Sequence, residues 1–273
     1  MSTNNLKPNI ISLLGVPFDD NSCYMKGAAE APDKIREALY SGSSNLFSES
    51  GIDLSKDSLF TDLGNLELRS KVFFLQEIEQ SVAKVLEKKS YVLSLGGDHS
   101  ITHPIVKAFS GKYDDMTVVH LDAHPDLYDV YDGNRYSNAC PFARIMEDKL
   151  VTRLIQVGIR TMNTQQREQT ERFGVEVFEM KNWQSYKDLT LEGTIYLSLD
   201  MDVLDPAFAP GVSHHEPGGL STRDVIDLIQ SLDVQIVGAD IVEFNPRRDP
   251  IGITSMAAAK LLKEILSKMI MQD

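Results

Sequence analysis

Residues 117–126 read TVVHLDAHPD, an apolar run that passes directly into carboxylate and imidazole side chains. Such a run is typical of a strand buried on both faces of a parallel sheet. Because alternate residues of an extended chain face the same way, Asp122, His124 and Asp126 can converge on one point. Imidazole and carboxylate together suit a divalent transition ion such as manganese, or zinc. His120 shares this parity but lies inside the strand, so we interpret it as a core or supporting residue rather than a ligand.

Strand and helix patterns alternate along the whole chain. Short β-branched runs predict strands at 10–14, 91–95, 117–121, 154–157, 175–178, 194–199 and 235–237. Apolar residues spaced three or four apart predict helices at 32–40, 71–89, 222–232 and 255–271. This alternation predicts an α/β fold, a parallel sheet with helices on its faces. Residues 41–63 have weak periodicity and predict a surface loop, and the sequence predicts one domain over residues 1–273.

Chemistry is expected where the strands end, because open α/β sheets bind ligands at the carboxyl ends of their strands. The strand at 91–95 runs into Gly96-Gly97-Asp98-His99, where two glycines permit a tight turn that delivers His99 to the sheet edge. The strand at 194–199 runs into Asp200-Met201-Asp202. Two carboxylates side by side after a buried strand repel one another, and a cation removes that cost. Taken alone, each motif also fits a structural histidine or a solvated loop.

Together the three strand ends supply six candidate metal ligands: His99, Asp122, His124, Asp126, Asp200 and Asp202. Six ligands exceed the needs of one open catalytic ion and fit two ions that share bridging carboxylates. A two-metal site acidifies a water and holds it as a nucleophile, so the reaction needs no Ser or Cys. Glu243 follows the strand at 235–237 and adds a carboxylate near the same rim, either for a cationic substrate group or as an ordinary loop residue.

Composition excludes several other classes of protein. Lys and Arg number 27 against 40 Asp and Glu, a net charge of −13 that would repel nucleic acid. The hydrophobic fraction of 42% is too high for a disordered chain, and no run of about 18 apolar residues predicts a membrane span. The N-terminal residues show no basic and apolar signal pattern, and two cysteines fit a reducing compartment. We therefore expect a cytoplasmic protein without nucleic-acid or membrane partners.

The strand-end motifs together resemble the ureohydrolase family of arginases and agmatinases. The resemblance covers nearly the whole chain and is closest to plant-type arginases. Its specificity comes from the combination of motifs, which lie at 15–19, 31–36, 96–100, 122–129, 198–205, 205–219 and 238–247.

This resemblance implies a three-layer α-β-α domain with a mostly parallel eight-stranded sheet. It also implies two Mn²⁺ ions per chain, held by the six ligands above. The family hydrolyses a guanidinium C–N bond to urea and an amine, so the expected substrate is L-arginine or agmatine. Glu243 matches the family glutamate that pairs with the guanidinium, and members are commonly trimers or hexamers.

One position departs from the family pattern. Family members carry a histidine in a Tyr-Ser-His motif, viewed as a proton shuttle to the leaving amine, whereas this chain has Tyr136-Ser137-Asn138. An amide does not titrate near neutral pH. The enzyme is then slower, passes protons through water or a neighbour, or acts on another guanidino or amide substrate; a deliberate replacement that traps substrate is a further reading. The pair His214-His215 is either a replacement base or two loop histidines.

The predicted catalytic residues are therefore Asn138, Glu243 and Asp126. The predicted substrate-binding residues are Asn134, Ser137, Glu243 and His215. Donors at Asn134, Arg135 and Ser137 would favour the α-carboxylate of arginine, whereas an acidic rim would favour agmatine. Two other classes stay open at this point: a one-zinc amide deacetylase of related fold, and a regulatory protein that keeps its metals without turnover.

Overall fold

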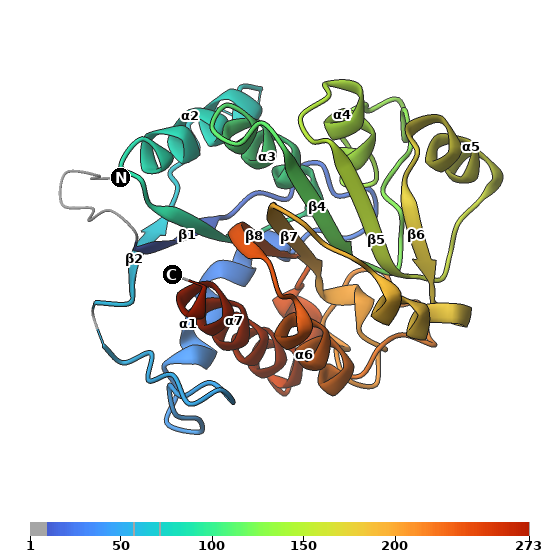
Figure 1. Ribbon diagram of the computed structural model, residues 1–273. Coiled ribbons are helices and arrows are strands. Elements are labelled where there is room, and N and C mark those ends of the chain that lie inside the picture. Colours follow the sequence, from blue (N-terminus) through green and yellow to red (C-terminus); the bar gives the residue numbers. More distant parts are fainter. Residues whose placement is uncertain (1–9, 57, 71, 273) are drawn as a thin grey trace.

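The computed structural model describes residues 10–56, 58–70 and 72–272. Within them, eight strands form one sheet in the order β2-β1-β3-β8-β7-β4-β5-β6 (Figure 1). Every neighbouring pair of strands is parallel. The strands are β1 (Ile11–Val16), β2 (Phe60–Asn65), β3 (Tyr91–Gly96), β4 (Met116–Leu121), β5 (Arg153–Ile159), β6 (Glu176–Glu179), β7 (Thr194–Asp200) and β8 (Gln235–Val242).

Helices cover both faces of the sheet, as predicted for a three-layer α-β-α architecture (Figure 1). One face packs against α1 (Ala31–Leu39), α6 (Thr222–Ser231) and α7 (Ile253–Met271). The other face packs against α2 (Phe74–Leu86), α3 (Thr102–Ser110) and α4 (Pro141–Glu147), with α5 (Thr164–Phe173) beside them. Short 3₁₀ turns join these elements: η1 (Ala28–Glu30), η2 (His99–Ile101), η3 (Met180–Asp188), η4 (Met201–Val203) and η5 (Pro246–Arg248).

Strand β4 shows why the central strands read as apolar runs. Val119 and Leu121 point into the core beneath α6 and α7, whereas Met116 and Val118 point into the core beneath α2 and α3. Both sets of side chains are fully buried. A strand covered on two faces keeps no polar alternation, which is the pattern that the sequence displays.

The prediction of a surface loop over 41–63 is wrong at its end, because β2 begins at Phe60. This strand lies at the edge of the sheet and pairs with β1 alone. Its Thr61 and Asp62 are exposed, and the Arg36 guanidinium of α1 binds the Asp62 carboxylate at 2.8 Å. Edge strands tolerate polar residues on both faces, so neither apolar run nor alternation marked it.

Helices α3, α4 and α5 were not predicted. Helix α4 has seven residues, and α5 is polar on every face, with only Gln166 and Gln169 buried. Helix α5 begins after Asn163, whose side chain caps the first turn in a capping box, and it ends at Gly174, which has a left-handed backbone conformation. The predicted helix at 71–89 appears as α2, and Lys71 lies outside the described residues. Within the described ranges, no helix combines the length and apolar character needed to cross a membrane.

Candidate metal centre and active site

The predicted chemistry lies at the carboxyl ends of four neighbouring strands, β3, β8, β7 and β4, at the centre of the sheet. His99 follows β3, Asp200 ends β7 and Glu243 follows β8. Asp122, His124 and Asp126 follow β4. Strands that are distant in sequence therefore end side by side, which brings together all six predicted ligands and Glu243.

In the turns that follow these strands, Asp side chains accept hydrogen bonds from nearby backbone N–H groups. The Asp98 side chain accepts a hydrogen bond from Ser100 N, and the Asp200 side chain accepts one from Asp202 N. The backbone N–H of His124 donates to Asp122 Oδ1 at 2.6 Å. These local caps fix the direction in which each turn leaves its strand.

Gly97 permits the turn that carries His99. A Cβ atom added at Gly97 would lie 1.9 Å from the carbonyl oxygen of Phe18, which accepts a hydrogen bond from Asp98 N. The carbonyl of Gly97 itself accepts a hydrogen bond from Glu243 N at 2.9 Å. Gly97 is therefore the point at which three segments of backbone meet.

We expect Gly97→Ala to lower the free energy of unfolding by about 1–3 kcal/mol, since backbone must shift to admit the methyl group. Gly42→Ala is the matched control, because nothing lies within 4 Å of its added Cβ and its backbone is not left-handed. Denaturant unfolding of the two variants measures the difference. Equal midpoints would contradict the close approach at Gly97.

The six candidate ligands form two overlapping groups. His99 Nδ1 lies 3.1 Å from Asp126 Oδ2 and 3.2 Å from both Asp122 Oδ2 and Asp200 Oδ2. His124 Nδ1 lies 3.0 Å from Asp202 Oδ2 and 3.4 Å from Asp122 Oδ1. In each group the candidate ligand atoms lie within 4.8 Å of one another. Asp122 belongs to both groups, with one oxygen toward each.

The chemistry of this cluster fits divalent cations. Although three carboxylate oxygens surround His99 Nδ1, this atom makes no hydrogen bond within the described part of the chain. Burial, and then the charge of Asp122, raise the pKa of Asp126 to about 7. Burial and the charge of Asp202 likewise raise the pKa of Asp200 well above its ordinary value. The fully charged cluster is therefore costly by itself, and cations between the donors would offset that cost.

His120 also lies against this cluster, in a supporting position. Its Nε2 is 2.7 Å from Asp122 Oδ2, and its Nδ1 is 3.0 Å from the side-chain amide of Gln156. The ring stacks on Phe142, with centroids 3.8 Å apart. Burial lowers the pKa of His120 to about 4, so the ring is neutral at physiological pH. His120, His99 and Asp122 also have ligand atoms close enough to hold an ion, but the contacts of His120 fit its interpretation as support for Asp122.

A cavity of about 180 Å³ opens over the cluster. Besides predicted residues, its lining contains side chains that the sequence analysis did not assign to the site: Cys23, Tyr128, Tyr131, Ala139, Thr161 and Gln166. Thr161 lies just after β5, so the rule that ligands gather at strand ends could have found it. Cys23 comes from the long segment after β1, and no local signal marks it.

Glu243 and Asn138 meet in the wall of this cavity. Glu243 Oε1 accepts hydrogen bonds from His99 N at 2.9 Å and from Asn138 Nδ2 at 3.0 Å. Asn138 Oδ1 in turn accepts a hydrogen bond from Cys23 N at 2.9 Å. The amide is thus held with its nitrogen toward Glu243. Both bonds to Glu243 fall on one oxygen, so the carboxylate keeps acceptor capacity for a cation in the cavity.

Comparison of the sequence with known proteins agrees with this arrangement of candidate metal ligands. The Arginase family model matches residues 9–267. The chain belongs to the arginase family. It is 48% identical to "Arginase 1, mitochondrial" of Arabidopsis thaliana, over 94% of this chain and 80% of that protein. It is 31% identical to an agmatinase of Bacillus anthracis, over 94% and 90% of the two chains.

A solved arginase-family structure also superimposes closely. The arginase from Medicago truncatula has a TM-score of 0.90 and 41% identity, over 96% of this chain and 87% of that one. The predicted resemblance to ureohydrolases, closest to plant arginases, is confirmed. Like its family, the protein is a hydrolase of C–N bonds in linear amidines, and its clustered His and Asp side chains can bind metal.

The prediction of a cytoplasmic location is wrong on the same comparisons. The relatives from Arabidopsis thaliana and Oryza sativa are named mitochondrial, or chloroplastic/mitochondrial, arginases. These names point away from a plain cytoplasmic protein. Composition and cysteine content describe a reducing environment but do not distinguish one such compartment from another.

Three residues predicted to bind the arginase-family substrate do not line the cavity. Asn134 Nδ2 donates to Asn21 Oδ1, and the buried Ser137 hydroxyl donates to Asn138 Oδ1. His215 is exposed and its Nε2 lies 2.8 Å from Pro210 O. Its neighbour His214 does line the cavity, 3.7 Å from Cys23 Sγ. Of the histidine pair, His214 is therefore the one placed beside the candidate site.

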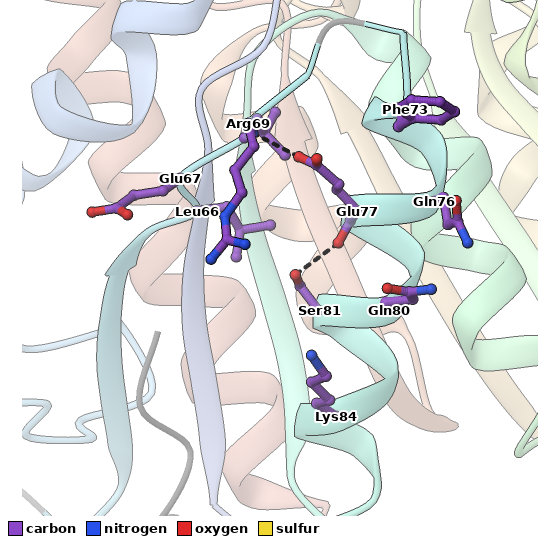
Figure 2. A pocket seen from close by; sticks show the side chains of 10 residues that line it. Leu66, Glu67, Arg69, Phe73, Gln76, Glu77, Gln80, Ser81 and Lys84 are labelled. Atoms are coloured by element: carbon purple, nitrogen blue, oxygen red, sulfur yellow. Dashed lines mark hydrogen bonds between the residues drawn. The ribbon is translucent and has the colours of Figure 1, made fainter.

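Another hollow, of about 520 Å³, lies between helix α2 and the segment that follows β2 (Figure 2). Glu77 lines it, and its carboxylate accepts a hydrogen bond from Arg69 N while its carbonyl accepts one from the Ser81 hydroxyl. The lining includes neither Glu243 nor any of the six candidate metal ligands. This hollow is therefore separate from the cavity over the candidate metal centre.

The backbone is strained at two residues of the site. Asp126 and Glu243 have φ values of 51° and 62°, in the left-handed region that side chains rarely adopt. Each such residue costs about 1–3 kcal/mol. Both line the cavity and both are predicted catalytic residues. Strained backbone conformations of this kind cluster at functional sites, which agrees with a functional role for this cavity.

Proposed function

We propose that this protein is a binuclear manganese hydrolase that converts L-arginine to urea and ornithine. The observation that carries the proposal is the pair of ligand groups that share Asp122, with Glu243 in the wall of the cavity above them. Arginine is favoured over agmatine because the arginases of Arabidopsis thaliana and Glycine max share 48% and 44% identity with this chain, against 31% for the agmatinases of Bacillus anthracis and Bacillus cereus.

Two Mn²⁺ ions would be held by His99, Asp122, Asp126 and Asp200 on one side, and by Asp122, His124 and Asp202 on the other. When bound, such ions supply an acidified water as nucleophile and stabilise negative charge on the reacting group. The overall reaction adds water across one guanidinium C–N bond, and the departing nitrogen takes up a proton.

Glu243 would bind the guanidinium cation and orient its carbon. The bonds from His99 N and Asn138 Nδ2 hold the Glu243 carboxylate in place before substrate arrives. Asp126 lines the cavity on the metal side and completes the set of acidic groups that face the cation. A desolvated carboxylate pairs strongly with a guanidinium, which can form two parallel hydrogen bonds.

Urea release in the presence of Mn²⁺, measured with L-arginine, agmatine and other guanidino acids, tests the proposal. Release from arginine in preference to the others supports it. If none of the panel releases urea although two metals bind per chain, the chain is a binding protein. One zinc per chain would instead favour the amide deacetylase reading. We also propose a homo-oligomer, a trimer or hexamer, which sedimentation of the same sample measures.

Asn138 cannot donate a titrating proton to the leaving amine, so we expect Asn138→His to raise kcat on the preferred substrate. General acid–base assistance contributes about 10²–10⁴-fold, which sets the ceiling for this gain. Asn138→Gln is the matched control, because it keeps an amide and adds no titratable group. Steady-state urea release from both variants measures the effect. A His variant no faster than the natural chain would show that protons leave by another route.

A further inference from the structure

Residues 128–139 form a loop in the wall of the cavity, and its two limbs are joined at the base and at the tip. At the base, Tyr128 N donates to Ala139 O at 3.1 Å. At the tip, Tyr131 and Asn134 exchange backbone hydrogen bonds of 3.2 and 2.9 Å. Tyr128, Tyr131 and Ala139 all line the cavity. The shape of this loop therefore sets where these side chains lie.

Between base and tip, a side chain from outside the loop joins the limbs. Arg144 Nη1 donates to Asp129 O at 2.9 Å and, over a longer distance of 3.5 Å, to Arg135 O. Arg144 Nη2 donates to Asp129 Oδ1 at 2.8 Å and lies 3.0 Å from Glu147 Oε2, which also binds the Arg135 guanidinium. A planar guanidinium carries five N–H donors in a fixed geometry, so it can serve acceptors on both limbs at once.

Arg144 projects from a helix that is fixed to the core. Phe142 and Ile145 of the same helix, α4, are fully buried in the core beneath α2 and α3. Helical side chains point back toward the N-terminus of their helix, so Arg144 faces the loop that precedes α4. The exposed fraction of Arg144 is 3%. Arg144 is not among the described residues that line the cavity, so it can affect a substrate only through the loop.

We propose that Arg144 is a positioning residue that clamps the limbs of the 128–139 loop together and so holds Tyr128 and Tyr131 ready for substrate binding. The inference rests on the proposed guanidino hydrolase function. Without the clamp, the substrate has to order the loop as it binds. Immobilising side chains and loop segments at an interface weakens binding, so the loss is expected to appear as a higher KM.

The residues beneath the loop are anchored independently of Arg144. Asn138 N donates to Asn21 O at 3.1 Å, and Asn138 Oδ1 accepts from Cys23 N at 2.9 Å. Asn138 is therefore held beside Glu243 by the segment that follows β1. Within the described ranges, the polar partners of Arg144 include neither Glu243 nor a candidate metal ligand. Loss of the clamp is thus expected to spare the turnover of bound substrate.

Urea release by the full-length, Mn²⁺-loaded protein tests the kinetic consequence. In Arg144→Met, KM for L-arginine is expected to rise by about 5–100-fold while kcat stays within about threefold, as when an interaction that only binds substrate is lost. A merely structural defect would reduce the active fraction and so lower kcat at unchanged KM. Arg172→Gln is the matched control, because the exposed Arg172 approaches Glu147 at 4.0 Å and its KM is expected to match the natural chain.

Trypsin gives a second readout that needs neither metal nor substrate, because the loop contains a cleavage site after Arg135. Proteolysis follows the population of locally opened chains, so Arg144→Met is expected to be cleaved there about tenfold faster or more. Arg172→Gln is expected to be cleaved at the natural rate. Mass spectrometry of the fragments identifies the cut. No urea release from the natural chain, together with faster cleavage of Arg144→Met, would defeat the proposed function but confirm the clamp on the loop.

Three other outcomes would overturn the inference: an unchanged cleavage rate in Arg144→Met, an unchanged KM despite faster cleavage, or full restoration of both by Arg144→Lys. Lysine keeps the charge but ends in one ammonium, so it is expected to leave KM and cleavage raised. If Arg144→Met does not fold, Asp129→Ala removes the carboxylate bound by Arg144 Nη2 and is expected to raise both in the same way. No change in Asp129→Ala would then contradict the clamp.

Discussion

Replacing Asp122 by Asn is expected to abolish Mn²⁺ binding at both sites and to reduce urea release by about 10⁴-fold or more, roughly 5.5 kcal/mol of transition-state stabilisation. Asp122 is the one side chain shared by the two ligand groups, and each of its oxygens faces a different histidine. An amide offers a single neutral oxygen, so it cannot serve both positions. Asp122 itself is fully inaccessible to solvent, so bulk water does not reach its position to replace the lost ligand.

Metal content by mass spectrometry and urea release measure this outcome on the same sample. Asp227→Asn is the matched control, since that residue lies on the exposed face of α6 and pairs only weakly with Arg223. A variant of Asp122 that keeps two metals per chain would mean that the two groups do not share this residue as a ligand.

Glu243→Gln is expected to lower kcat/KM on the preferred guanidino substrate by tens- to thousands-fold while leaving two metals bound. Removing one partner of a buried charge pair costs about 2–5 kcal/mol. Glutamine keeps the shape of Glu243 and can still accept from His99 N, but it carries no charge to pair with a guanidinium. Because Glu243 is not in either ligand group, metal affinity is expected to stay close to that of the natural chain.

The distinction between binding and chemistry is visible in the kinetic constants. If Glu243 acts on the bound guanidinium, KM rises together with a fall in kcat. Glu37→Gln, at an exposed position of α1, is the control and is expected to change neither constant. Loss of metal from Glu243→Gln with unchanged kinetics per bound metal would contradict the proposed role.

The sequence was sufficient to predict which His and Asp side chains gather at the candidate metal centre, because their signal is local. Asp122 and Asp200 directly follow apolar strands, and parallel strands bring all such positions to one edge. The edge strand β2 was missed because it lies at the outer edge of the sheet and has exposed polar residues. Its sequence therefore contains no apolar run to detect. In both cases the reliability of the prediction followed the burial of the strand.

The walls of the cavity were harder to predict than its floor. Cys23 reaches the cavity from a segment about 100 residues before the β4 motif, and Gln166 reaches it from a segment about 40 residues after that motif. Asn134 and Ser137 could donate hydrogen bonds to a carboxylate, yet their side chains donate to Asn21 and Asn138 instead. Residue type and proximity in sequence do not reveal which partner a polar side chain will choose.

The order of strands across the sheet also constrains how the centre comes into being. Strands β3 and β4 are consecutive in the chain, yet β8 and β7 lie between them in the sheet. The turns that carry His99 and Asp122 therefore cannot reach their final separation until the C-terminal third of the chain has been inserted. During synthesis, β8 must therefore emerge from the ribosome before the six candidate ligands can come together. Metal binding at the proposed centre would therefore follow assembly of the sheet, and until then the acidic side chains would lie apart on separate segments.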